Sequence, residues 1–328
     1  MPRVLITGAA GFIGMHASIR FLKEGWDVVG LDNINNYYST KLKRDRLKNI
    51  EYCAAEVDQH FQFFEADLNS NVWSKLHRMK FEVVLHLAAQ AGVRYSLENP
   101  EAYLESNILG FQKVLSFVQK SKITRFLYAS SSSVYGKISS QPFIETADCN
   151  DPESYYAATK KANEMMAKAY FHTHNLKSIG LRFFTVYGPW GRPDMAPMLF
   201  AKSAFANDEI KVFNYGKQKR DFTYIDDIVE GILRLAYLNR FPNKALVCNI
   251  GNGQPVELLE FIQIIEQETA KTLTKKFTEP QKGDVEITYS DTNLLKELTG
   301  YSPKINLKKG IGLFIDWYKT YYEITPEN

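Results

Sequence analysis

The chain has 328 residues, of which 45% are hydrophobic, 23% charged and 13% aromatic. This composition is typical of a folded globular protein and excludes a globally disordered or fibrous chain. Forty basic and 37 acidic residues leave a formal net charge of +3. So small and dispersed an excess does not make a nucleic-acid-binding surface, and we expect no nucleic-acid partner.

The sequence shows no pattern typical of a disulfide framework, a metal site, a secretion signal or a membrane span. Cys53, Cys149 and Cys248 lie far apart and form no CxxC pair, so neither a disulfide framework nor a zinc site is predicted. The six histidines show no metal-ligand spacing, and we expect no metal. Neither a basic-then-apolar leader nor a run of about 18 apolar residues occurs. We therefore expect a cytoplasmic protein without a membrane partner.

Strands and helices are predicted to alternate over the first half of the chain. Residues 3–31 have the pattern strand, glycine-rich turn, helix ending near Gly25 and second strand, which is one βαβ unit. Longer segments of helical period include residues 101–120 and 155–175. Further short apolar runs, each a predicted strand, lie at residues 61–64, 83–87, 126–129 and 178–184. This alternation predicts an α/β fold with a doubly wound parallel Rossmann sheet.

The pattern changes after Tyr187. The breaker-rich stretch of residues 188–193 precedes shorter and less regular elements. Residues 226–238 are helix-like and 246–250 strand-like, so we expect the chain to return to the first sheet. The predicted domains are a Rossmann domain, formed by residues 1–186 plus about 222–250, and a smaller C-terminal α/β domain, formed by residues 187–221 plus 251–328.

A glycine-rich turn predicts a dinucleotide site. Gly8, Gly11 and Gly14 have the spacing GxxGxxG between a strand and a helix, which allows a tight turn and places the helix N-terminus at a pyrophosphate. Asp32 ends the second strand, where a carboxylate can bind ribose hydroxyls and repel a 2′-phosphate, which favours NAD over NADP. The predicted cofactor-binding residues are Gly8, Gly11, Phe12, Ile13, Gly14, Asp32, Asn33, Asp67, Leu68, Leu87, Ala88, Ala89, Tyr156 and Lys160.

A tyrosine, a lysine and a serine run are the predicted reactive groups. Tyr156 and Lys160 are four residues apart on a predicted helix and so share a face. An adjacent ammonium and a cationic nicotinamide ring would favour the phenolate, so Tyr156 could take a proton from a substrate hydroxyl. Residues 130–133 are all serine and follow a predicted strand. A hydroxyl at a strand's carboxyl end points into the cofactor cleft, where it would hold the reacting hydroxyl.

Together, these motifs resemble those of the extended short-chain dehydrogenase/reductase family, and within it the NAD-dependent nucleotide-sugar epimerases. Three longer segments, residues 31–38, 86–96 and 182–195, are similar to UDP-glucuronate 4-epimerases. The likeness covers nearly the whole chain. It implies a tightly bound NAD, a UDP-uronic acid substrate and a homodimer built from the helices predicted near residues 101–120 and 155–175.

The resemblance also implies a reaction. It places Ser131, Tyr156 and Lys160 at the catalytic positions of an isomerase that converts UDP-glucuronate to UDP-galacturonate through a 4-keto intermediate, for polysaccharide biosynthesis. Tyr156 would remove the proton of the 4-hydroxyl while the C4 hydride passes to the nicotinamide, and the hydride would return to the opposite face. The predicted substrate-binding residues are Arg94, Ser131, Ser132, Ser133, Thr185, Arg192, Phe213, Arg220 and Asp284.

Arginines are the predicted partners of the substrate's negative charges. A 4-keto uronic acid is a β-keto acid and loses CO₂ unless its carboxylate is restrained. Arg192 is the candidate restraint, because arginine binds carboxylates in bidentate fashion, and Arg94 is a second candidate that could instead be structural. By the resemblance, Arg220 binds the diphosphate and Asp284 holds the ribose or positions that arginine. Phe213 could contact the uracil.

The serine run separates this chain from related enzymes. Those that eliminate water typically carry an Asp-Glu pair at positions matching Ser132 and Ser133, and related decarboxylases usually carry a Glu matching Ser133. Both carboxylates are absent here. Two alternatives stay open: a 4-epimerase of neutral or N-acetylated UDP-hexoses with a different pocket, and a non-catalytic NAD-binding sensor or scaffold.

Overall fold

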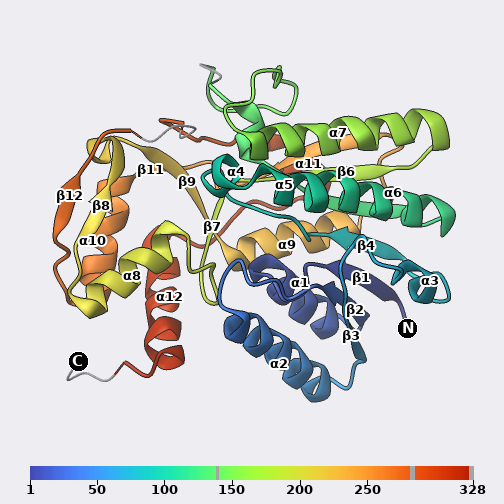
Figure 1. Cartoon of the computed structure of the whole chain (residues 1–328), viewed down its shortest axis with the longest axis horizontal. Coiled ribbons are helices and arrows are strands. Elements are labelled where there is room, and N and C mark those ends of the chain that lie inside the picture. Colours follow the sequence, from blue (N-terminus) through green and yellow to red (C-terminus); the bar gives the residue numbers. More distant parts are fainter. Residues whose placement is uncertain (138–139, 281–284, 325–328) are drawn as a thin grey trace.

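The computed structural model describes residues 1–137, 140–280 and 285–324. In this part of the chain, a seven-stranded parallel sheet forms the centre of the molecule, with strand order β10-β6-β5-β4-β1-β2-β3 (Figure 1). The order reverses between β1 and β4, as in a doubly wound sheet, so the predicted Rossmann-type α/β fold is confirmed. The strands are β1 (Arg3–Thr7), β2 (Asp27–Asp32), β3 (Phe61–Glu65), β4 (Val83–His86), β5 (Arg125–Ser131), β6 (Ser178–Phe183) and β10 (Ala245–Ile250).

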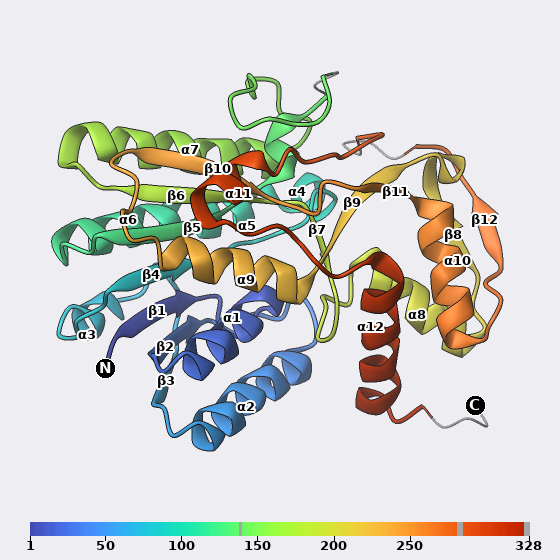
Figure 2. The same cartoon turned by 180° about the vertical axis from the view of Figure 1, so that it is seen from behind.

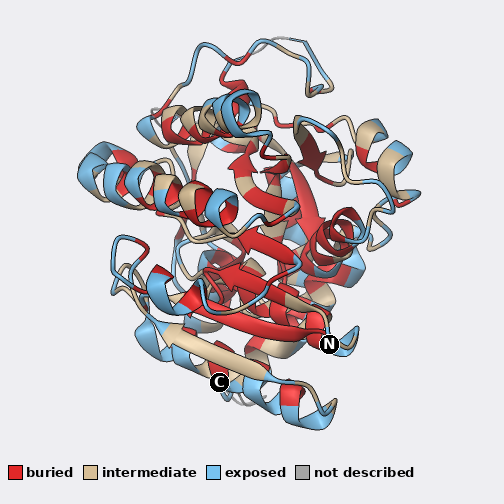
Figure 3. Cartoon of the chain, turned by 90° about the vertical axis from the view of Figure 1, so that its right-hand side faces the viewer, coloured by how far each residue is buried: buried red, intermediate tan, exposed pale blue. Residues whose placement is uncertain are grey.

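Apart from the partly exposed edge strand β3, both faces of this sheet are buried, which explains the nearly continuous apolar runs of its strands. On β1, Val4 and Ile6 pack on one face and Leu5 packs on the other. Figure 3 shows the buried sheet between helices whose outer surfaces are exposed. The first face is covered by α1 (Phe12–Lys23), α2 (Thr40–Glu56) and α9 (Ile225–Ala236), and the second by α3 (Trp73–Leu76), α6 (Gly110–Lys120) and α7 (Tyr155–His174).

The helical segment predicted over residues 101–120 is interrupted. It consists of α5 (Pro100–Tyr103), the π-helical turn η1 (Leu104–Leu109) and α6. The wide turn brings the backbone carbonyl of Asn107 to the amide of Asn163 on α7, with an N···O distance of 2.6 Å. Periodicity alone does not reveal such a turn, because the extra residue is fixed by contacts with a distant helix.

A smaller region lies beside the main sheet (Figure 2). Phe261 and Phe314 are fully buried in its core. Its elements are β7 (Thr185–Tyr187), α8 (Ala196–Ala206), β8 (Ile210–Val212), β9 (Lys219–Tyr224), β11 (Pro255–Glu257), α10 (Leu258–Thr269), β12 (Lys275–Phe277) and α12 (Leu307–Tyr321). Between them, α11 (Asn293–Thr299) packs against α9 and β10 of the main sheet. Among the described residues, no helix has the length and apolar character needed to cross a membrane.

A buried ion pair joins the main sheet to α7. Arg182 on β6 donates from Nε and Nη2 to Oε1 and Oε2 of Glu164, both at 2.8 Å. The hydroxyl of Ser130 on β5 donates to the same Oε1 at 2.6 Å. All three side chains are buried, so each charge depends on the other for compensation.

We predict that Glu164→Ala lowers the free energy of unfolding by about 3–5 kcal/mol, because the buried Arg182 loses its counter-charge. The measurement is urea denaturation followed by circular dichroism. Glu65→Ala is the matched control, since Glu65 pairs with Arg44 at the exposed surface and its loss should cost less than about 1 kcal/mol. Equal losses in the two variants would contradict the assigned role of the buried pair.

Candidate active site

One cavity of about 790 Å³ lies at the carboxyl ends of the central strands, where the strand order reverses, and extends to the smaller region. This is the position expected for a ligand in a doubly wound fold. Asp284 lies outside the described residues. The other predicted site residues all line this cavity: Gly8, Gly11, Phe12, Ile13, Gly14, Asp32, Asn33, Asp67, Leu68, Leu87, Ala88, Ala89, Arg94, Ser131, Ser132, Ser133, Tyr156, Lys160, Thr185, Arg192, Phe213 and Arg220.

The glycine turn fits a dinucleotide pyrophosphate. Gly8 has φ +74°, which favours glycine. A Cβ on Gly14 would lie 2.0 Å from the carbonyl oxygen of Gly8, so α1 packs directly on the turn. Gly11 is the N-cap of α1 and offers no side-chain cap. The first amides of α1 therefore remain available to an anion at the cavity wall.

The end of β2 fits the adenosine half of NAD. Asp32 accepts hydrogen bonds from the backbone N–H of Ala10 through Oδ2 at 3.2 Å and from that of Ile34 through Oδ1 at 2.9 Å. Burial raises the pKa of Asp32, while these amides and the nearby Lys43 lower it. Beside it, Asn33 Nδ2 donates to Asp67 Oδ2 at 2.9 Å. The carboxylate is thus held at the cavity, where it suits ribose hydroxyls better than a 2′-phosphate.

Lys160 and Tyr156 extend from the first turns of α7, which begins after the N-cap Ser154. Lys160 is buried, and its Nζ donates to the carbonyl of Ala129 at 2.9 Å. Burial lowers the pKa of Lys160 to about 8. The pKa of Tyr156 is raised by burial and lowered by a hydrogen bond with Ser131 and by the charge of Arg192. The effect of the Arg192 charge on the pKa of Tyr156 was not predicted from the sequence.

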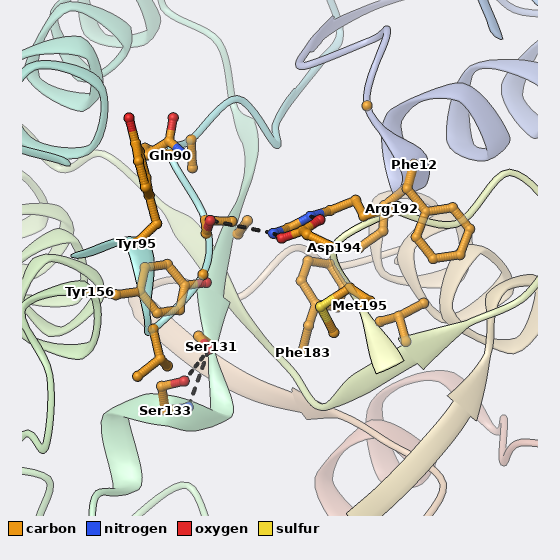
Figure 4. A pocket seen from close by; sticks show the side chains of 18 of the residues that line it. Phe12, Gln90, Tyr95, Ser131, Ser133, Tyr156, Phe183, Arg192, Asp194 and Met195 are labelled. Atoms are coloured by element: carbon orange, nitrogen blue, oxygen red, sulfur yellow. Dashed lines mark hydrogen bonds and ion pairs between the residues drawn. The ribbon is translucent and has the colours of Figure 1, made fainter. Parts of the chain in front are cut away.

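The serine run begins at the end of β5. Ser131 Oγ donates to Ser133 Oγ at 3.1 Å and accepts the backbone N–H of Ser133 at 3.2 Å. This bond caps the short 3₁₀ turn η2 (Ser132–Tyr135). Figure 4 shows Ser131 between Ser133 and the ring of Tyr156 at the cavity. The local turn thus fixes a hydroxyl next to the phenol.

Asn107 supports the wall behind Tyr156 and was not predicted. Its Oδ1 accepts the backbone N–H of Gln90 at 2.9 Å, and its Nδ2 donates to the carbonyl of Gln90 and to Thr159 Oγ1, both at 3.0 Å. Asn107 is a polar residue buried inside a helical segment. Such a residue indicates a specific hydrogen-bond network, because its buried polar groups need partners. The network ties the π-helical turn to α7 and to the loop after β4.

Asp194 occupies one edge of the Arg192 guanidinium. Nε of Arg192 donates to Asp194 Oδ1 at 3.1 Å, and Nη2 pairs with Oδ2. Tyr37 donates its hydroxyl to the same Oδ2 at 3.2 Å. Figure 4 shows this pair on the opposite side of the cavity from Tyr156. Arg192 was predicted from the sequence, whereas Asp194, only two residues further on, was not.

The other predicted arginines lie toward the smaller region. The guanidinium of Arg94 lies 5.0 Å from the ring centre of Phe213, a cation–π contact. Arg220 donates from Nη1 to the backbone carbonyls of Lys219 at 3.0 Å and of Glu286 at 2.9 Å. These contacts fix both side chains at the cavity wall, beyond the reactive groups.

We predict that Arg192→Met raises the pKa of Tyr156, because the variant lacks a cation that stabilises the phenolate. The phenol should therefore ionise at higher pH than in the wild type. Tyrosine labelled with ¹³C at Cζ, with Tyr156→Phe for assignment, gives the titration by NMR. Arg94→Met is the control and should leave the titration unchanged. An unaltered or lower pKa in Arg192→Met would refute the prediction.

Comparisons with known proteins show the family of this chain. Residues 4–251 match the family described as the NAD dependent epimerase/dehydratase family. Protein CapI of Staphylococcus aureus is 45% identical, covering 98% of this chain and 99% of the relative. The probable UDP-glucuronate 4-epimerase of Rhizobium meliloti is 39% identical, covering 98% of each chain.

Solved structures show the same likeness. The UDP-glucuronic acid 4-epimerase from Bacillus cereus, in complex with UDP-glucuronic acid and NAD, is 32% identical with a TM-score of 0.90, covering 98% of this chain and 100% of the other. MoeE5 in complex with UDP-glucuronic acid and NAD is 30% identical with a TM-score of 0.84, covering 97% and 99%. The resemblance noted in the sequence is thus confirmed, and the chain belongs to the NAD dependent epimerase/dehydratase family.

Proposed function

We propose that this protein is an NAD-dependent isomerase that converts UDP-glucuronate to UDP-galacturonate. The observation that carries the proposal is that Ser131, Tyr156, Lys160 and Arg192 line the same cavity as the glycine turn. The names of the relatives and the ligands of the B. cereus structure support it. We take the product to serve polysaccharide biosynthesis.

The chain's own residues supply the proton chemistry. When bound, NAD would supply a reversible hydride acceptor for C4, so that the reaction has no net oxidation. Tyr156 removes the proton of the 4-hydroxyl, and Ser131 holds the oxygen of that hydroxyl. The ammonium of Lys160, fixed by the Ala129 carbonyl, and the charge of Arg192 favour the phenolate. Tyr156 returns the proton to O4 after the sugar has presented its other face.

The carboxylate of the 4-keto sugar has to be restrained. If the carboxylate turns perpendicular to the plane of the keto carbonyl, it is lost as CO₂. We assign this role to Arg192 together with the hydroxyls of Ser132, Ser133 and Thr185, which line the cavity. Asp194 already engages Nε and Nη2 of Arg192. The guanidinium is therefore held in one orientation, and neutral hydroxyls carry much of the contact with the substrate.

The UDP half would lie toward the smaller region. We assign the diphosphate to Arg220 and the uracil to Phe213 with its neighbour Arg94, all on the cavity wall. Asp284 is proposed as the partner of the ribose or of Arg220. This assignment corresponds to a Rossmann domain of residues 1–186 plus about 222–250 and a UDP-sugar domain of residues 187–221 plus 251–328.

The direct test supplies UDP-glucuronate, UDP-glucose and UDP-N-acetylglucosamine separately to the purified protein without added metal. We expect UDP-glucuronate alone to be converted to its C4 epimer, as followed by chromatography and NMR. Tyr156→Phe should lower kcat by about 10²-fold or more, since it removes the general base. Tyr155→Phe, a change at the neighbouring exposed tyrosine, should keep kcat near that of the wild type.

Other products would select other functions. A UDP-pentose released together with CO₂ would establish decarboxylation. Turnover of the neutral sugars alone would establish the alternative epimerase. It would also contradict the assignment of Arg192 as the partner of a substrate carboxylate. A folded, NAD-bound protein that converts none of these sugars would favour the sensor or scaffold.

We further propose that the protein is a cytoplasmic homodimer. The three cysteines are free and buried, which supports a reducing compartment. Leu104 and Leu109 on the π-helical turn and Met165 on α7 are large, exposed apolar residues, and these elements contact one another. A second copy of the chain would cover them.

We predict that Met165→Glu combined with Leu109→Glu produces a monomer, because two charges would have to be buried at the interface. Sedimentation velocity measures the mass in solution. Leu313→Glu is the matched control, since Leu313 is an exposed apolar residue on α12, and it should leave the dimer intact. A wild-type monomer, or a double variant that still dimerises through other surfaces, would rule out this interface.

A further inference from the structure

Arg46 on α2 is a fully buried cation outside the set of residues assigned above. Its exposed fraction is 0%. Burial of a guanidinium is unfavourable unless its N–H groups are hydrogen-bonded, so a fixed buried arginine signals a specific arrangement of acceptors. The acceptors around Arg46 come from segments that are far apart in the sequence.

The side chain of Arg46 connects two loops. Nη1 donates to the carbonyl of Ala10 at 3.1 Å and to the hydroxyl of Tyr38 at 2.7 Å. Nη2 donates to the carbonyls of Trp190 at 2.6 Å and of Gly191 at 3.1 Å. Ala10 belongs to the glycine turn, whereas Trp190 and Gly191 directly precede Arg192. One planar group therefore spans the cofactor turn and the loop of the proposed carboxylate restraint.

The second loop needs this support. Trp190 has φ +62°, a conformation that a bulky side chain adopts only when its surroundings enforce it. Its ring packs against Trp317 and Tyr321 of α12, at centroid distances of 5.4 and 4.9 Å. Tyr321 in turn donates its hydroxyl to Asp45 on α2 at 2.8 Å. Arg46 thus holds the backbone of the loop, and the aromatic contacts hold the side chain of Trp190.

We propose that Arg46 is a positioning residue that couples the glycine turn to the loop carrying Arg192, so that a cofactor bound at the turn orders the substrate side of the cavity. The inference rests on the proposed function only for the role of Arg192. Arg46 acts through backbone carbonyls on both sides. A lysine cannot reproduce the coupling, because its single ammonium lacks the planar fork that reaches both loops at once.

The primary test does not depend on turnover. Hydrogen–deuterium exchange of residues 188–194 is measured in the full-length protein with NAD removed and with NAD at saturation. In the wild type, NAD should slow this exchange. In Arg46→Lys the slowing should be lost, while NAD bound at the turn still protects residues 8–14. Arg44→Lys is the matched control on the same helix, since Arg44 pairs with Glu65 at the surface, and it should behave as the wild type.

Turnover gives the second readout. With UDP-glucuronate, Arg46→Lys should lower kcat by roughly 10- to 100-fold, because the loop that carries Arg192 would be displaced from its position at the substrate. It should also raise the fraction of UDP-pentose, because the carboxylate restraint is loosened. A merely structural role would lower the melting temperature and leave the product ratio unchanged. If Arg46→Lys does not fold, Tyr38→Phe removes one acceptor of the same guanidinium and should weaken the NAD-dependent protection in part.

Two results would overturn the coupling: NAD-dependent protection of residues 188–194 that persists in a folded Arg46→Lys protein, or wild-type exchange that does not respond to NAD. Failure of the proposed function is a separate outcome. A wild type that turns over only neutral UDP-hexoses would refute uronate epimerisation, while the exchange experiment would still decide whether Arg46 links the two loops.

Discussion

The close packing of backbones around Gly8 is the constraint on which the rest of the site depends. A Cβ on Gly8 would lie 2.7 Å from the backbone nitrogen of Ala88, after β4, and the carbonyl of Gly8 occupies the place that a Cβ on Gly14 would need. The N–H of Gly8 also donates to the carbonyl of Leu31 at 2.7 Å. The ends of β1, β2 and β4 and the start of α1 thus converge on one residue without a side chain. Their convergence places the amides of the turn and the carboxylate of Asp32 on the same cavity wall.

Two carboxylates in this cavity have polar protein partners within the described part of the chain. Asp194 pairs with Arg192, and Asp32 accepts backbone amides near Lys43. Such a pocket can admit an anionic sugar without large rearrangement at Arg192, because Asp194 already orients that guanidinium. Lys160 differs, since its ammonium relies on the neutral carbonyl of Ala129, which is consistent with its lowered pKa.

Local sequence patterns predicted the fold and the part of the site that is carried by single segments. Four predicted features each lie within one strand-turn-helix unit, where spacing determines which side chains share a face. They are the glycine turn, Asp32, the serine run and the Tyr156/Lys160 pair. Arg46, Asn107 and Asp194 were not found. Arg46 reaches Trp190 across 144 residues and Asn107 reaches Thr159 across 52 residues. Asp194 resembles an ordinary loop acid until its partner is placed. The π-helical turn escaped for the same reason, because Asn163 fixes it from another helix.

The contact between α12 and the Trp190 loop has a consequence for the order of folding. Trp317 and Tyr321 pack on Trp190, and Tyr321 reaches Asp45 across a separation of 276 residues. Contacts with so large a sequence separation form after the local units have closed, since the entropy of the intervening chain must first be reduced. During synthesis, the first βαβ unit can therefore exist long before the sugar side of the cavity takes its final shape. A nascent chain with its dinucleotide turn already formed would still lack a properly seated Arg192 until α12 had emerged and docked.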